Sequence, residues 1–196
     1  SAYIDFPVNR TEIHEDYRNN PVELRKIRQT IDVVRNDPDV RITSLSIKGY
    51  ASPEGTYTNN TRLAKGRTAT LKTYVRELYH FPDSVILTSY EPEDWSGLEA
   101  YVDSTNLKNR DAILALIRSD MEPDAKEKAI KSTYPEDYRF LLQNVYPGLR
   151  HSDYVVQYVV RTYTDVAEIR RIMKTRPQKL SLRELYIAVQ DLEPGS

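Results

Sequence analysis

The sequence predicts an α+β fold: a mixed four-stranded sheet with two helices on one face and a helical insertion before the last strand. Three observations predict it. Strand-like and helix-like segments alternate over residues 1–93, several short helical segments follow at about 94–147, and a long strand-like run comes after them at 152–164. Alternation at this spacing indicates right-handed crossovers and partly parallel pairing. The chain has 196 residues and is 39% hydrophobic, which allows a sizeable core.

Four segments have the pattern of strands. The first, AYIDFPV, alternates apolar and other residues, and its Pro7 favours an edge strand or the end of a strand. The second, VRITSLSIKGY, runs from about Val40 to Tyr50, and DSVILTSYEP is the third. The fourth, SDYVVQYVVRTYT, is apolar on both faces, which predicts a central position in the sheet.

Two long segments have the 3.6-residue period of amphipathic helices. In NNPVELRKIRQTIDVVRNDPD, the start signal consists of Asn20 as cap, Pro21 at the first helical position and Glu23 as the carboxylate that reaches back. The second helix is expected from about Asn60 to Tyr79. Both helices have an apolar stripe that can pack on a sheet.

The segment at 94–147 has a different pattern. It holds the short helical pieces WSGLEAYV, RDAILALIRS, DAKEKAIKS and PEDYRFLLQNVY. Because a strand follows it, we interpret it as an insertion rather than a separate domain. Two further helices are expected near 166–174 and 181–192, so the predicted division is a domain at 1–163 and C-terminal helices at 164–196.

Composition and motifs argue against several classes of function. The formal net charge of -1 disfavours a general nucleic-acid binder, and the absence of cysteine excludes disulfides and thiolate chemistry. No apolar run approaches the roughly 20 residues that span a bilayer. His14, His80 and His151 are scattered, as expected of surface or capping histidines, and no hydrolase, NTPase, zincin or dinucleotide motif occurs. We therefore expect neither an enzyme nor a cofactor or metal.

Arg67 is the main candidate for a functional side chain. Leu63, Arg67 and Leu71 are spaced i, i+4 and i+8, so the guanidinium lies on or beside the sheet-facing side of its helix. An unpaired buried charge is very costly, so a carboxylate partner is expected. Gly66 indicates close approach by another segment. Two interpretations stay open: an internal ion pair with Glu54, and a site for a ligand carboxylate.

The stretch GYASPEGTYTNNTRLAKGRT, residues 49–68, resembles the ligand loop and following helix of the OmpA C-terminal-like, peptidoglycan-associated family. That family's pattern runs roughly G-[YH]-T-D-x-x-G-x-x-x-x-N-x-x-L-S-x-x-R-A. The matching positions, without gaps, are Gly49, Tyr50, Gly55, Asn60, Leu63 and Arg67. The resemblance covers about residues 1–93 and 150–163 and implies the family's fold.

The loop variant GYASPEG resembles a sub-branch of that family found in large bacterial envelope proteins. In that sub-branch an OmpA-like domain with a helical insertion precedes tetratricopeptide-like helices. The resemblance implies that the C-terminal stretch KLSLRELYIAVQDLEPGS opens such a region.

The resemblance implies a non-catalytic module, in the periplasm or associated with the outer membrane, that binds the diaminopimelate of a peptidoglycan stem peptide. In the family a loop aspartate holds the ligand's ammonium and the helix arginine holds its carboxylate. Arg67 occupies the arginine position, but Ser52 stands in place of the aspartate, and Glu54 can supply the missing charge only if the turn at Pro53 points it inward.

The expected ligand-binding residues are Arg67, Asn60, Ser52, Glu54, Tyr50 and Gly55. The alternative is an assembly scaffold of an outer-membrane complex, which contacts other envelope proteins through the insertion and the C-terminal helices and has lost peptidoglycan binding.

Overall fold

The computed structural model describes residues 1–162, 166–176 and 178. The chain divides into two compact units, residues 1–158 and 159–196. The first unit contains, in order, β1 (Ala2–Asp5), α1 (Asn20–Asn36), β2 (Val40–Tyr50), α2 (Tyr57–Leu78), β3 (Ile86–Glu91), the helices α3 to α7, and most of β4 (His151–Val160). The division at 163 that the sequence suggested stays a prediction.

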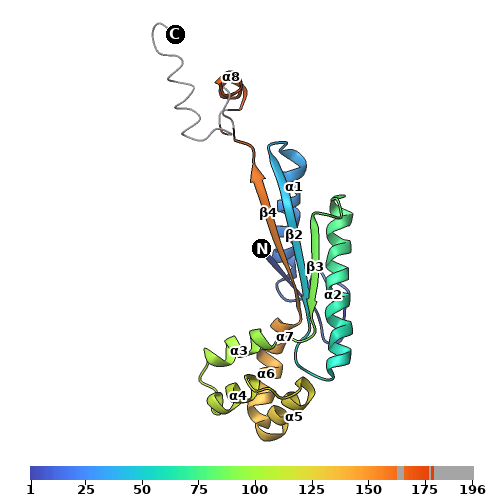
Figure 1. Cartoon of the computed structure of the whole chain (residues 1–196), viewed down its shortest axis with the longest axis vertical. Helices are drawn as coiled ribbons and strands as arrows, with labels where there is room; N and C mark the ends of the chain where they lie inside the picture. Colours follow the sequence, from blue (N-terminus) through green and yellow to red (C-terminus); the bar gives the residue numbers. More distant parts are fainter. Residues whose placement is uncertain (163–165, 177, 179–196) are drawn as a thin grey trace. The chain divides into compact units, whose positions relative to one another are not determined.

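The four strands form one mixed sheet in the order β1-β4-β2-β3 (Figure 1). β1 runs antiparallel to β4, with Ala2 opposite Tyr154, and β2 runs parallel to β3, with Leu45 opposite Ile86. The helices α1 and α2 pack against one face of the sheet (Figure 1). The predicted α+β architecture, with its helical insertion before the last strand, is confirmed.

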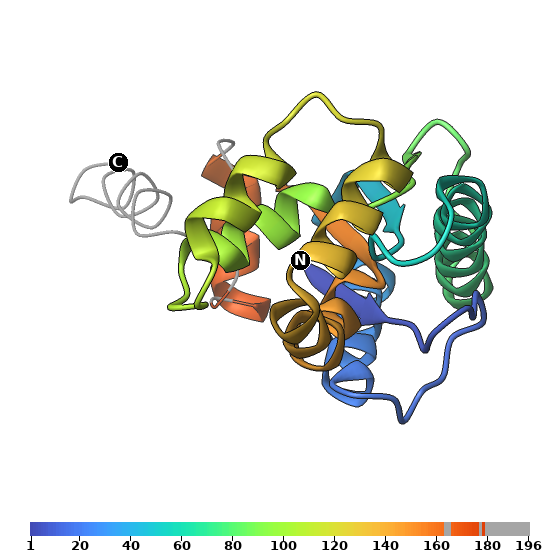
Figure 2. The same ribbon diagram turned by 90° about the horizontal axis from the view of Figure 1, so that it is seen from below.

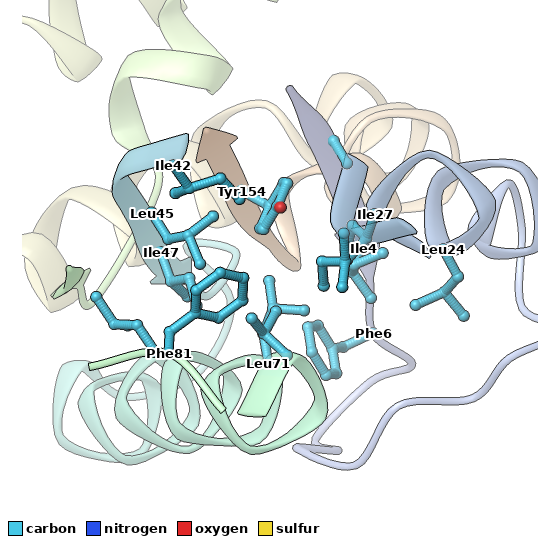
Figure 3. Close-up of a cluster of buried hydrophobic side chains, with 14 residues drawn as sticks. Ile4, Phe6, Leu24, Ile27, Ile42, Leu45, Ile47, Leu71, Phe81 and Tyr154 are labelled. Atoms are coloured by element: carbon cyan, nitrogen blue, oxygen red, sulfur yellow. The ribbon is translucent and has the colours of Figure 1, made fainter. Parts of the chain in front are cut away.

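The main core lies between the sheet and these two helices (Figure 3). Most of its buried members come from the strands and from one stripe of each helix, whereas Phe6 and Phe81 lie in the segments after β1 and after α2. They include Ile4, Phe6, Leu24, Ile27, Ile42, Leu45, Ile47, Leu71, Phe81 and Tyr154.

The insertion folds into five helices at one end of the sheet (Figures 1 and 2). They are α3 (Trp95–Asp103), α4 (Arg110–Ile117), α5 (Pro123–Thr133), α6 (Pro135–Asn144) and α7 (Tyr146–Leu149). Asp94 caps α3, and its carboxylate accepts a hydrogen bond from the Gly97 N–H at 3.0 Å. These helices bury a second apolar cluster that includes Leu98, Ile113, Ile130, Leu141 and Tyr146.

Helix α2 begins at Tyr57, three residues before the predicted Asn60. The Thr56 side chain caps it by accepting a hydrogen bond from the Asn59 N–H at 3.2 Å. The Tyr57 N–H also donates to the Asp124 carboxylate at 2.8 Å, a partner 67 residues away. The predicted start was wrong because the Thr56 cap precedes it and the second partner comes from another part of the chain.

Two further expectations were wrong in detail. Glu23 does not reach back to cap α1, because its carboxylate instead accepts a hydrogen bond from the Tyr3 N–H of β1 at 3.1 Å. β4 is central, as predicted, but Val155 and Val159 remain 45% and 47% exposed. Tyr158 and Val160, on the other face of the strand, are 57% and 56% exposed, so the C-terminal half of β4 is exposed on both faces despite its apolar content.

The second unit contains α8 (Val166–Thr175), where a helix was predicted. Its residues Ile169 and Ile172 are buried, and Glu168 pairs with Arg161 at 2.5 Å. The helix expected at 181–192, and with it the tetratricopeptide-like region, lies outside the described residues. None of the helices within 1–162 and 166–176 is long and apolar enough to cross a membrane.

Candidate functional site

A cavity of about 190 Å³ lies beside the first turns of α2, and we call it the Arg67 cavity. It is bordered by the segment after β1, the loop after β2, the start of α2 and the residue before β4. The predicted site residues that line it are Ser52, Glu54, Gly55, Asn60 and Arg67. Arg150, which the sequence analysis did not single out, lines it as well.

Arg67 is fully buried, and its guanidinium donates to three backbone carbonyl oxygens. Nε donates to the carbonyl of Arg10 at 2.9 Å, Nη1 to that of Tyr50 at 3.0 Å, and Nη2 to that of Pro7 at 3.3 Å. The expectation of a carboxylate partner within the chain is therefore wrong. Carbonyl dipoles solvate the charge instead, because the segment after β1 passes directly over this helix.

Gly66 explains that close approach. A Cβ atom at this position would lie 2.6 Å from the Thr11 Cγ2 atom. The absence of a side chain at Gly66 thus lets the segment after β1 reach α2 and offer the carbonyls of Pro7 and Arg10 to Arg67. The close approach predicted from the sequence is confirmed, and its function is to complete the surroundings of the guanidinium.

A guanidinium has five N–H groups, so two of those on Arg67 are left over. One belongs to Nη1 and the other to Nη2, since each of these atoms donates a single hydrogen bond among the described residues. Burial, followed by the nearby charges of Arg150 and Arg62, lowers the pKa of Arg67 to about 10. Arg67 is therefore still charged at neutral pH, and it borders the cavity although its side chain is fully buried.

Glu54 does not pair with Arg67. Its Oε2 accepts a hydrogen bond from Nη2 of Arg150 at 3.0 Å, and the two side chains are 36% and 6% exposed. The loop that carries Glu54 is tight, with the Glu54 N–H donating to the carbonyl of Ser52 at 2.8 Å. Arg150 comes from the end of the helical insertion, 96 residues further along the chain, which no local pattern could indicate.

Asn60 fixes the loop to the start of α2. Its side-chain nitrogen donates to the carbonyl of Glu54 at 2.9 Å and to Oε2 of Glu93 at 2.6 Å. Burial raises the pKa of Glu93, although hydrogen bonds from Asn60 and Trp95 oppose the shift. Both N–H groups of the Asn60 amide are thus engaged within the chain, so Asn60 fixes the position of the loop at the edge of the cavity.

Tyr50 was predicted to belong to the site, but it does not line the cavity. Its ring stacks on that of His151, with centroids 4.3 Å apart and planes 11° from parallel. The Tyr50 carbonyl, rather than its ring, contributes to the site by accepting the hydrogen bond from Arg67.

His151 is buried, contrary to the expectation of a surface or capping histidine. Nε2 lies 2.8 Å from Oδ2 of Asp94, and Nδ1 lies 2.5 Å from Oδ1 of Asp153. Burial alone would lower the pKa of His151, but the two carboxylates outweigh it and raise the pKa to about 9. The i, i+2 spacing of His151 and Asp153 on one strand could have indicated this pair, whereas Asp94 could not have been found.

No protein-family model matches the chain, and no curated protein matches it. Among solved structures, the chain is similar to the peptidoglycan-associated lipoprotein from Burkholderia pseudomallei, with 12% identity and a TM-score of 0.42. The match covers 80% of this chain and 91% of that one. At this level of similarity, the fold rests on the strand order and pairing of the chain itself, and the proposed sub-branch stays a prediction.

The described part of the chain holds no group of three or more His, Asp or Glu side chains placed to bind a metal ion. The Arg67 cavity instead offers guanidinium, amide and hydroxyl groups, which are suited to holding a polar ligand. Its volume is below the roughly 300 Å³ at which sites for drug-sized ligands begin, so the end of a larger molecule is the best fit.

Proposed function

We propose that this chain is a non-catalytic module of the bacterial cell envelope, and that the Arg67 cavity binds peptidoglycan through its stem peptide. One observation carries the proposal. Arg67, Ser52, Glu54, Gly55 and Asn60, five of the six residues expected to bind the ligand, surround one cavity. Its buried guanidinium has N–H groups to spare, and capture of a carboxylate is the task for which arginine is best suited.

The proposed location, in the periplasm or at the outer membrane, rests on the resemblance of residues 49–68 to the envelope family. The proposed role is binding because the cavity lining supplies donors and charge for a ligand carboxylate. Peptidoglycan is the proposed partner because its stem peptides present such carboxylates in the same compartment.

Retention of the chain on purified peptidoglycan sacculi tests this proposal. Replacement of Arg67 is a poor probe, because it would leave three backbone carbonyl oxygens without their hydrogen-bond donor. Val8 lines the cavity and is 58% exposed, so Val8→Asp adds a negative charge at the site without disturbing the core. Val33→Asp is the matched control, since Val33 is 51% exposed on α1 and does not line the cavity.

We expect Val8→Asp to lower retention by about tenfold, because the new carboxylate competes for the guanidinium and repels the ligand. Val33→Asp should bind like the wild type. Equal retention of both variants, or no retention of the wild type, would contradict the proposal.

The alternative is an assembly scaffold that no longer binds peptidoglycan. The observation that favours it is the engagement of Glu54 with Arg150, which leaves Ser52 without a charged neighbour to hold an ammonium group. A wild-type chain that sacculi do not retain, but that forms a stoichiometric complex with a defined envelope protein, would support this alternative.

A further inference from the structure

The side chains that line the Arg67 cavity carry more positive than negative charge. Two guanidinium groups, on Arg67 and Arg150, and one carboxylate, on Glu54, line it, and the other lining residues are uncharged. The cavity therefore carries one excess positive charge. Walls of low polarizability around such a charge focus its field and favour an anion.

The two guanidinium groups are buried, whereas the carboxylate is partly in solvent. Arg67 is 0% and Arg150 is 5% exposed, while the Glu54 side chain is 36% exposed. A buried cation without an anion is strongly disfavoured, but a carboxylate that is already part-solvated loses little when it moves into water. In the ion pair of Glu54 and Arg150, Glu54 is thus the group that another carboxylate can displace.

The same arrangement disfavours a ligand with an ammonium group beside its carboxylate. Such an ammonium would enter a cavity that already holds Arg67 and Arg150, and like charges at close range repel. Ser52 offers only a neutral hydroxyl, and Glu54 already pairs with Arg150. A carboxylate whose neighbouring groups are neutral, as at the C-terminus of a peptide, meets no such repulsion.

We infer that the Arg67 cavity selects a carboxylate with uncharged neighbours, that the ligand displaces Glu54 from Arg150, and that Glu54 acts as an internal competitor. This inference rests on the proposed function, since it concerns the same cavity, and it names the chain-terminal carboxylate of the peptide as the recognised group. The ligand carboxylate then receives hydrogen bonds from the spare N–H groups of Arg67 and from the freed Arg150.

The test compares two probes that differ at the nitrogen, which is an uncharged amide in N-acetylalanine and an ammonium in alanine. Both are titrated into the full chain and followed by NMR chemical shifts. We expect N-acetylalanine to bind at least about tenfold more tightly than alanine. Glu54→Gln should tighten N-acetylalanine binding by about three- to tenfold, because the internal competitor is neutralised. Arg150→Gln should weaken it by at least about tenfold, through loss of one guanidinium.

Glu77→Gln is the matched control for Glu54→Gln. Glu77 is exposed near the C-terminal end of α2 and does not line the cavity, so the variant changes the overall charge equally and should leave N-acetylalanine binding unchanged. Alanine binding as tight as that of N-acetylalanine, no binding of either, or weaker binding by Glu54→Gln would each overturn the inference.

The sacculus assay separates this inference from the proposed function. Selective binding of N-acetylalanine without retention on sacculi would refute the proposed function and leave the inference standing. Retention on sacculi together with a preference for alanine would refute the inference and support the proposed function.

Discussion

The sheet layer, formed by β1 to β4 with α1 and α2, and the helical insertion, formed by α3 to α7, are held together in different ways. Each region has its own apolar core, and the two cores share no residue. Polar contacts join the regions. Asp94 at the start of α3 contacts His151 of β4, Arg150 after α7 contacts Glu54, and Asp124 of α5 accepts a hydrogen bond from the Tyr57 N–H.

The difference shows how the candidate site is built. Apolar burial is non-directional, so each core specifies that its region is compact without specifying how the regions meet. Hydrogen bonds and ion pairs depend on direction and distance, so the polar contacts set that geometry. The Arg67 cavity lies at this junction, with Arg150 supplied from the insertion side and Arg67 from the sheet layer.

The largest expected effects come from breaking the two cores. Leu71→Ala in the sheet core and Leu141→Ala in the insertion core each remove a fully buried side chain, and each should lower the free energy of unfolding by about 2–5 kcal/mol. Because the cores are separate, the double variant should show the sum to within about 0.5 kcal/mol in urea unfolding. A coupling above about 1 kcal/mol would show that the regions share one core.

Titration of His151 should weaken the junction. Its folded-state pKa of about 9 lies above the unfolded value of about 6.5, so its contribution is complete below pH 6.5 and is lost as the pH rises towards 9. The shift corresponds to roughly 3 kcal/mol in the free energy of unfolding.

Urea unfolding from pH 6 to pH 10 measures this loss. His151→Gln should remove most of the pH dependence between 6.5 and 9, whereas His80→Gln, at an exposed position, should retain it. Identical pH profiles for the wild type and His151→Gln would show that the contacts with Asp94 and Asp153 do not stabilise the imidazolium.

A smaller effect is expected from a negative charge at position 52, where the family has an aspartate. This change tests whether charge at the junction determines which ligand binds. Ser52→Asp places a carboxylate in the cavity wall near Arg67 and should raise the affinity for alanine by about tenfold, or about 1.4 kcal/mol, because its ammonium gains a partner. Ser52→Asn introduces a side chain of similar size to aspartate but without charge, so it should leave the affinity for alanine unchanged. NMR titration checks both variants, and an equal response would show that side-chain size, rather than charge, sets the preference.

Much of the site could be predicted from the sequence because its elements lie close together along the chain. The i, i+4, i+8 spacing of Leu63, Arg67 and Leu71 placed the guanidinium on the buried side of α2, where the structure has it. Gly66 indicated a close approach that the Thr11 contact confirms.

The partners of the charged groups could not be predicted in the same way. Arg67 was expected to meet a carboxylate and instead meets three carbonyls, because a buried guanidinium is satisfied by whichever acceptors the fold brings within reach. His151 was expected to be a surface or capping residue because the three histidines are scattered along the sequence, and its partner Asp94 is 57 residues away.

The sequence by itself determined the order of strands and helices, the position of the insertion and the inward side of α2, since hydrophobic period and capping are local properties of the chain. Only the tertiary structure decided that Glu54 pairs with Arg150 and that His151 lies between two aspartates. Such contacts join residues from different elements, and their strength depends on distances of a few ångströms that exist only once both cores have formed.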